Sequence, residues 1–236
     1  MKGDISHHIW KLRPILTRTP DVQSLRQWGS QLKGHWRRTF ERKYGNLIGL
    51  VSVEVQCTAI SALTQYYDPP LRCFTFRDFQ LAPTLEEYER LLGIPLGKSL
   101  PYLFRGHYSS WTSVANLLKA SELEVSKQKK NRNRGDGDWL TFIDVYGLLV
   151  YNVVLFPYIE DYVDLAAIDA FLGKRDRGES PIVAVLANTY YTLNYYREKN
   201  GRGLRCCTSL LYLWITTHLF HSKGRTEYPI EDHNWS

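Results

Sequence analysis

The stretch ALTQYYDPPLRCFTFRDFQLAPTLEEYERLLGIPL, residues 62–96, decides the fold of this chain. Two short aromatic runs, 73–76 and 79–81, flank the polar pair Arg77-Asp78. Aromatic runs of this length around a polar turn are typical of a β-hairpin. The prolines that follow Asp68 end the preceding helix, because a residue before proline is disfavoured in the α conformation. We therefore predict a helix that ends near 67 and a small hairpin near residues 73–82.

A helix start signal follows the hairpin at Thr84. Glu87 stands three residues later, and this spacing is that of a capping box, in which each side chain accepts a hydrogen bond from the other residue's backbone N–H. Gly93 is a suitable C-terminal stop, with Pro95 just beyond it. The pattern predicts a short helix over residues 85–92.

Outside this stretch, apolar residues recur at helical spacing through most of the chain. The clearest stripe lies in residues 21–44, where a helix is expected to begin at Asp21 as N-cap. The alternation at 51–55 is compatible with a strand, but the spacing beyond it favours a helix from about 52 to 67. Further helices are expected at 109–126, 140–156, 164–172, 181–198 and 207–221.

These patterns predict an all-α protein with one small β-hairpin. Residues 1–20 are expected to be an irregular arm, and 21–236 a single helical domain with an exposed basic loop at 127–138. The chain has 236 residues, 44% of them hydrophobic and 14% aromatic, which is enough to build a substantial core.

The sequence also indicates the cellular compartment of the protein. No segment approaches the roughly 18 consecutive apolar residues of a membrane span, and the N-terminus has no apolar signal region. The four cysteines form no CxxC pair. We expect free, mostly buried thiols, an intracellular protein and no contact with a membrane.

The net charge of +6 is unevenly distributed. Residues 1–46 carry ten Lys or Arg against three acids, and residues 127–135 carry five basic residues and no acid. These clusters are either solvated faces or a surface for an acidic partner or nucleic acid. The candidate residues are Arg26, Lys33, Arg37, Arg38, Arg42, Lys43, Lys127, Lys129, Lys130, Arg132 and Arg134.

No pattern in the sequence indicates catalysis. The nucleophile, phosphate-loop, dinucleotide and HExxH motifs are absent from the sequence, and the lysines at 127–130 stand in a polar setting that does not suit Schiff-base chemistry. His218 and His221 lie one helical turn apart, but a structural zinc needs four ligands. We therefore expect no enzyme activity, no cofactor and no metal.

Residues 62–96 resemble the plant mobile domain family, in its transposon-derived form sometimes described as aminotransferase-like. The similarity extends more weakly over about 47–221. The matching residues are Tyr67, Asp68, Pro69, Phe74, Phe76, Thr84, Leu85, Glu87, Leu91, Leu92, Gly93 and Pro95. The resemblance implies a nuclear protein connected with transposons or gene silencing, which acts by binding other nuclear proteins. Some relatives carry a fused phosphatase, so a phosphatase-like partner is implied as well.

Overall fold

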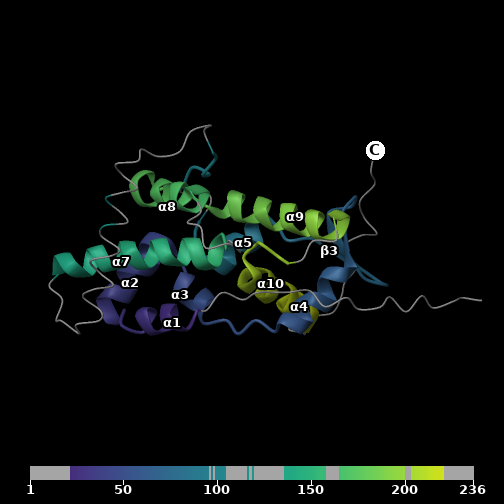
Figure 1. Ribbon diagram of the computed structural model, residues 1–236, viewed down its shortest axis with the longest axis horizontal. Coiled ribbons are helices and arrows are strands. Elements are labelled where there is room, and N and C mark those ends of the chain that lie inside the picture. The colour runs from purple at the N-terminus through teal and green to yellow at the C-terminus, as the bar shows by residue number, and fades with distance from the viewer. Residues whose placement is uncertain are drawn as a thin grey trace, which may run out of the picture.

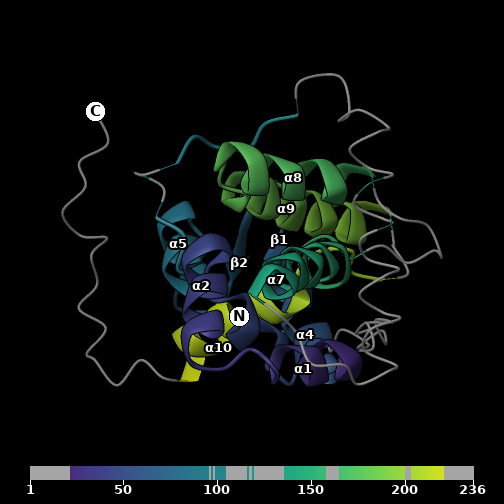
Figure 2. The same cartoon turned by 90° about the vertical axis from the view of Figure 1, so that its left-hand side faces the viewer.

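The computed structural model describes residues 22–95, 97, 99–104, 116, 119, 136–157, 165–199 and 203–220. Within these residues the chain is mainly helical, with one small antiparallel sheet of three strands. The predicted fold class is therefore confirmed. Figures 1 and 2 show α8 and α9 along one side of the molecule, α7 beneath them, and α1, α4 and α10 on the opposite side.

The first half of the chain forms short elements, and the second half forms longer ones. The first half contains α1 Gln23–Gly29, α2 Gly34–Tyr44, α3 Leu47–Val51, α4 Cys57–Leu63, the 3₁₀ helix η1 Thr64–Tyr66, β1 Tyr67–Asp68, β2 Cys73–Thr75, β3 Gln80–Leu81 and α5 Leu85–Leu92. The second half contains α7 Asp136–Val150, continued by a π-helical turn η3 Tyr151–Leu155, then α8 Leu165–Arg177, α9 Ile182–Lys199 and α10 Thr208–Phe220.

The single helix predicted for 21–44 is wrong, because the chain breaks it into α1 and α2. Asp21 lies outside the described residues, and α1 begins after Val22 without a side-chain cap. Residues 30–33 form a turn in which Leu32 is buried in the core. Gly34 then takes a positive φ of 52°, which glycine adopts without the strain that a Cβ brings.

The helix predicted for about 52–67 is also shorter than expected. Residues 53–56 are not helical, and α4 spans only Cys57–Leu63. At its end, Tyr67 and Asp68 form β1, which pairs with β2 in antiparallel register, Tyr67 opposite Phe74. The extended backbone of Asp68 agrees with the restriction that Pro69 imposes on the residue before it.

The predicted hairpin is confirmed and becomes part of a larger sheet. β2 pairs with β3, with Phe74 opposite Leu81, so the strand order is β1-β2-β3. The turn is closed by a hydrogen bond from the Phe76 N–H to the Phe79 carbonyl, 2.9 Å long. Phe74 is fully buried and packs the sheet against the helical core.

The four helices predicted for the second half are present with shifted ends. α8 runs on to Arg177, five residues beyond the expected end. Residues 136–138 belong to α7, so this part of the predicted loop 127–138 is wrong. The rest of that loop, the arm 1–20 and almost all of the predicted helix 109–126 lie outside the described residues; only Asn116 and Lys119 of that helix are described, both helical.

One hydrophobic core joins the described elements from α1 to α10. Its centre is rich in aromatic rings: Tyr44 stacks on Phe171 with ring centroids 5.5 Å apart, and Tyr151 meets Phe171 edge to face. Asp138–Leu155 is long and apolar enough to cross a membrane by length and composition, but 56% of it is buried inside this fold. Its contacts with α1, α2 and α8 make it a central core helix.

Candidate functional site

Arg26, the first residue of the predicted basic face, is held by the fold. Its Nε donates to the carbonyl oxygen of Val51 at 3.0 Å, and its Nη2 donates to that of Val53 at 3.1 Å. These bonds join α1 to the last residue of α3 and to the non-helical segment that follows it. Arg26 is half-buried and therefore has a structural role.

The basic residues of α2 point in different directions. Arg37 pairs with Glu41 one turn later, Nε to Oε1 at 2.8 Å, and Lys43 pairs with Asp144 of α7 at 2.7 Å. Arg38 and Arg42 are exposed, and in the described part of the chain neither has an acidic partner. The predicted face is thus divided into separate groups.

The remaining basic candidates are placed as follows. Lys33 is exposed directly before α2 and has no ion pair among the described residues. The structure does not describe the five at Lys127, Lys129, Lys130, Arg132 and Arg134. No joint surface of α2 and that segment is therefore defined.

The residues that carry the family-like motif have fold-making positions. Leu92 is fully buried like Phe74, and Gly93 ends α5 in the left-handed conformation, φ 63°. The Asp68 carboxylate accepts a hydrogen bond from the Leu71 N–H, closing the turn before β2. Phe76, Leu85 and Leu91 are half-buried against the core, whereas Pro95 is exposed.

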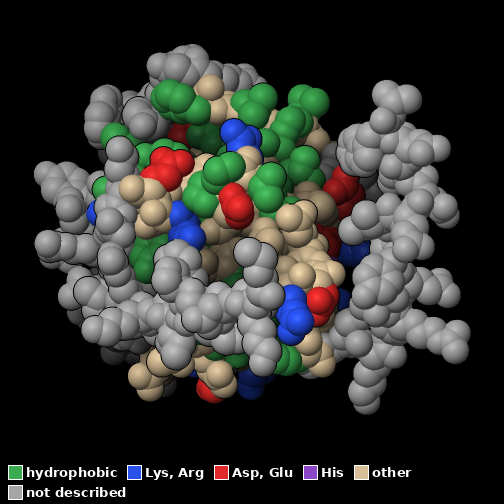
Figure 3. Space-filling model, turned by 90° about the vertical axis from the view of Figure 1, so that its right-hand side faces the viewer, with side chains coloured by type: hydrophobic (Ala, Val, Ile, Leu, Met, Phe, Trp, Pro, Cys, Tyr) green, Lys and Arg blue, Asp and Glu red, His purple; other side chains and the backbone are tan. Residues whose placement is uncertain are grey.

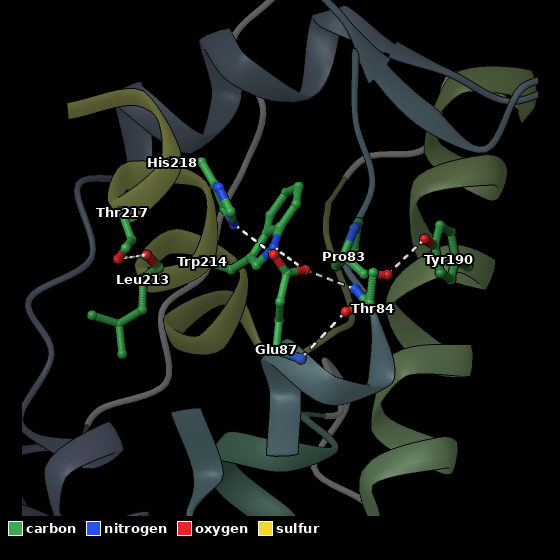
Figure 4. A network of polar contacts seen from close by, with 8 residues as sticks. All are labelled: Pro83, Thr84, Glu87, Tyr190, Leu213, Trp214, Thr217 and His218. Carbon is green, nitrogen blue, oxygen red and sulfur yellow. Dashed lines mark hydrogen bonds and ion pairs between the residues drawn. The ribbon is translucent and has the colours of Figure 1, made fainter. Parts of the chain in front are cut away.

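The capping box is present and belongs to a larger polar network. The Thr84 hydroxyl accepts from the Glu87 N–H at 3.3 Å, and Glu87 Oε2 accepts from the Thr84 N–H at 3.0 Å. The same Oε2 accepts from the indole of Trp214 at 2.8 Å, while Oε1 lies 2.7 Å from His218 Nε2. Figure 4 shows both α10 side chains directed at this carboxylate.

This network connects α5 to α10 across 127 residues of sequence, from Glu87 to Trp214. The sequence indicated Glu87 only as part of a helix cap and His218 as a candidate metal ligand. The spacing of Trp214 and His218, one turn apart on one helix, was the only signal that both could reach the same group. Among the described residues no cluster of three metal-ligating side chains is found, and His221 lies outside them.

The network also changes the acidity of Glu87. Partial burial on its own raises the pKa of this carboxyl group. The hydrogen bonds from the Thr84 backbone and the Trp214 indole, together with the charge of His218, outweigh burial and hold the pKa below its ordinary value. The ionised carboxylate is therefore the form that the fold stabilises.

We expect this carboxylate to make stability depend on pH. A pKa that is lower in the folded state adds stability above the unfolded-state pKa, and that stability is lost as pH falls through the folded value. Glu87→Gln should lower the free energy of unfolding at neutral pH by about 1 kcal/mol. The loss is this small because the carboxylate is partly exposed. Urea unfolding of both proteins from neutral to about pH 3 should show this difference shrinking on acidification. A difference independent of pH would contradict the assignment.

The cysteines are free, as predicted, and three of the four are buried. Cys206 and Cys207 are adjacent and fully buried before α10. Burial raises the pKa of both thiols, that of Cys207 to about 12. Neither is a thiolate near neutral pH, so their position suits packing rather than nucleophilic chemistry.

A group of exposed aromatic side chains lies where the sheet meets α9. Phe76 stacks between Tyr66 and Phe79, with ring centroids 5.0 and 4.9 Å apart, and Tyr191 stacks on Tyr195 at 6.4 Å. We call these five residues the aromatic face. Tyr66, Phe79, Tyr191 and Tyr195 are 51, 42, 69 and 46% exposed.

The segment that carries Tyr66 is joined to α9, which carries the Tyr191 and Tyr195 stack. The hydroxyl of Tyr67, next to Tyr66, donates to Asn194 of α9 at 2.8 Å, and β1 packs on α9. Figure 3 shows hydrophobic side chains gathered over the upper part of this end of the molecule, with charged groups standing singly among them. The sequence pattern did not reveal this face, because Phe76 and Phe79 lie in the predicted hairpin and the three tyrosines in two predicted helices far apart in the chain.

The fold and its surfaces define a mainly helical domain with a small sheet, a buried aromatic core and an exposed aromatic face. The model of the DUF7745 family, a domain of unknown function, matches residues 25–236, and the chain belongs to this family. No curated protein and no solved structure matches the chain.

Proposed function

We propose that this domain is a non-enzymatic protein-interaction domain and that the aromatic face contacts its partner. The observation that carries the proposal is the exposure of four stacked aromatic residues at one end of the molecule. Aromatic side chains are enriched in the buried centres of protein interfaces and dominate their hot spots. A cluster of this kind is a common mark of a binding surface.

The organisation of the face favours binding over incidental exposure. Each ring already stacks on a neighbour, so it loses little conformational freedom when a partner covers it. The backbone beneath is held by the turn bond between Phe76 and Phe79 and by the contact of Tyr67 with Asn194. A preorganised apolar surface with phenol groups at its edge suits a folded protein partner.

The resemblance to plant mobile domains supports a nuclear setting for this interaction. It further supports a transposon-derived origin, a connection with transposon or gene silencing, and nuclear protein partners that include a phosphatase-like one. These points rest on the family-like motif from Asp68 to Pro95.

Direct nucleic-acid binding by the basic residues of 26–43, with those of 127–135, is the second candidate function. The exposed side chains of Lys33, Arg38 and Arg42 favour it, because each is available to a phosphate. The pairing of Arg37 with Glu41 and of Lys43 with Asp144 counts against it. A long nucleic-acid track needs adjacent cations that are not already paired with carboxylates of the same domain.

The interaction is tested by removing the aromatic face without changing the fold. Tyr66, Phe79 and Tyr191 are replaced together by serine, and the matched control replaces Leu103 and Leu140, which are 60 and 54% exposed elsewhere. Each tagged variant is used to enrich proteins from the cells that express the domain. We expect partners of the wild type to fall by about tenfold or more with the aromatic variant only.

Equal melting temperatures of the three proteins serve as the folding control. Equal recovery of partners by the aromatic variant and the wild type would refute the role of this face. An equal loss of partners in both variants would indicate non-specific hydrophobic adsorption instead. A partner signal abolished by nuclease treatment would favour the nucleic-acid alternative.

A further inference from the structure

A second surface feature lies away from the aromatic face, where α1 turns into α2. A hollow of about 470 Å³ opens there. Arg26, Lys33 and Arg37 line it, together with Gly29, Gly34 and Tyr146, and none of its lining residues is acidic. Three cations around one small space create a local positive potential that favours an anion.

The N-terminus of α2 adds to this potential. The helix has 11 residues, no acidic residue in its first turn and no side-chain cap at Lys33. The first backbone N–H groups of a helix lack the usual partner four residues earlier and carry its positive dipole end. Here the Trp36 N–H bonds back to the Lys33 carbonyl at 3.1 Å, so the donors at this end are the N–H groups of Gly34 and His35. Gly34 lies at this end with no atom within 4 Å of where its Cβ would stand. The backbone here is open to a ligand.

A buried tyrosine provides an independent observation. Tyr146 is fully buried, and its hydroxyl has no hydrogen-bond partner among the described residues. That hydroxyl lies against Gly29, which lines the same hollow. A buried hydroxyl left unsatisfied is uncommon and calls for an explanation such as a missing ion.

The phenol is suited to donate a hydrogen bond. Burial raises the pKa of Tyr146, and the positive charge of Arg37 only partly opposes the rise. The group therefore keeps its proton at neutral pH. A neutral O–H with no acceptor among the described residues, under the influence of the Arg37 charge, matches the needs of an oxyanion.

We propose that this hollow binds one phosphate group, either as free phosphate or as a phosphate monoester. Lys33 and Arg37 supply charge, the start of α2 supplies N–H donors, and the Tyr146 hydroxyl donates from the wall of the hollow. Arg26 contributes charge while it keeps its bonds to the Val51 and Val53 carbonyls. The site goes beyond the proposed protein interaction and does not depend on it.

The arrangement suits a compact anion better than a nucleic-acid strand. Arg38 and Arg42, which a strand along α2 would need, do not line the hollow. Glu41 already occupies the Nε of Arg37, so phosphate must compete with this carboxylate. Releasing Arg37 from Glu41 should therefore tighten binding.

The experiment is a calorimetric titration of the full chain with inorganic phosphate and, separately, with phosphoserine. Arg37→Ala and Lys33→Ala should each weaken binding by about tenfold or more, the loss of one charge-assisted contact. Tyr146→Phe should weaken it by a smaller factor without lowering the melting temperature, since it removes an unsatisfied hydroxyl. Glu41→Gln should strengthen it.

Matched controls distinguish a specific phosphate site from a diffuse positive potential. Arg38→Ala removes the same charge from another side of α2, and Tyr151→Phe removes the hydroxyl of a second fully buried tyrosine that does not line the hollow. Both should leave binding unchanged. Tighter phosphoserine than phosphate binding identifies a monoester as the ligand, and the reverse identifies free phosphate.

Three outcomes would overturn the proposal. The first is the absence of saturable binding of either probe. The second is an equal loss in Arg38→Ala and Arg37→Ala, which would show a diffuse charge effect. The third is a preference for duplex DNA that depends on Arg38 and Arg42, which would assign the surface to nucleic acid.

Discussion

Trp214→Ala is expected to destabilise the domain by about 3–5 kcal/mol, the usual cost of removing a large buried aromatic side chain. Trp214 is 1% exposed, and its ring lies 5.7 Å from that of Phe74 and 5.4 Å from that of His218. It joins the sheet to α10 and also donates to Glu87. The substitution therefore removes packing and leaves a partly buried carboxylate short of a donor.

Trp214→Phe separates these two contributions. The smaller ring keeps much of the packing and removes the indole N–H, so the loss should be only about 1–2 kcal/mol. Urea unfolding at neutral pH measures both variants against the wild type. Equal losses of stability in the two variants would mean that the hydrogen bond outweighs packing, which would contradict a packing role for this buried ring.

Gly45→Ala should have the second large effect on stability. Gly45 joins α2 to α3 with φ 78°, and a Cβ there would overlap the Leu92 carbonyl oxygen and the Ile94 side chain. The neighbouring N–H of Asn46 donates to the same carbonyl at 2.6 Å, so the two chain segments cannot separate freely. With ψ −162°, Gly45 occupies a backbone region that essentially only glycine adopts, which costs other residues about 1–3 kcal/mol, and overpacking adds about 1–3 kcal/mol more.

Gly178→Ala is the matched control for this clash. Gly178 also has a positive φ, 69°, but open space surrounds the position of its Cβ. It should therefore lose only the backbone contribution of about 1–2 kcal/mol. Thermal unfolding of both variants checks the comparison. A similar loss at both positions would show that the close approach of Gly45 to Leu92 does not matter.

Local signals in the sequence predicted the parts of the fold that local chemistry determines. The Thr84–Glu87 capping box, the left-handed stop at Gly93 and the hairpin all depend on residues within a few positions of one another. The break between α1 and α2 escaped prediction, because Leu32 continues the apolar spacing on both sides of the turn. Periodicity alone does not distinguish a bent pair of helices from one straight helix.

Which side chains remain exposed and unpaired at the surface depends on tertiary contacts that the sequence does not reveal. Lys43 looked like part of a basic face until α7 placed Asp144 beside it, 101 residues later. The Tyr66 ring looked like the last turn of a core helix, but the chain turns into β1 there and leaves it half exposed. Tertiary contacts, rather than residue type, decide which of these groups remains available to a partner.

Site-specific photo-crosslinking tests the central claim most directly. A photoreactive amino acid is placed at Phe79 in the aromatic face or at Leu140 near the start of α7, two positions of comparable exposure, 42 and 54%. Irradiation in the cells that express the domain should give discrete protein crosslinks from position 79 and none of these from position 140. Crosslinks of equal yield and identity at both positions, or none at position 79, would contradict a protein-binding role for the aromatic face.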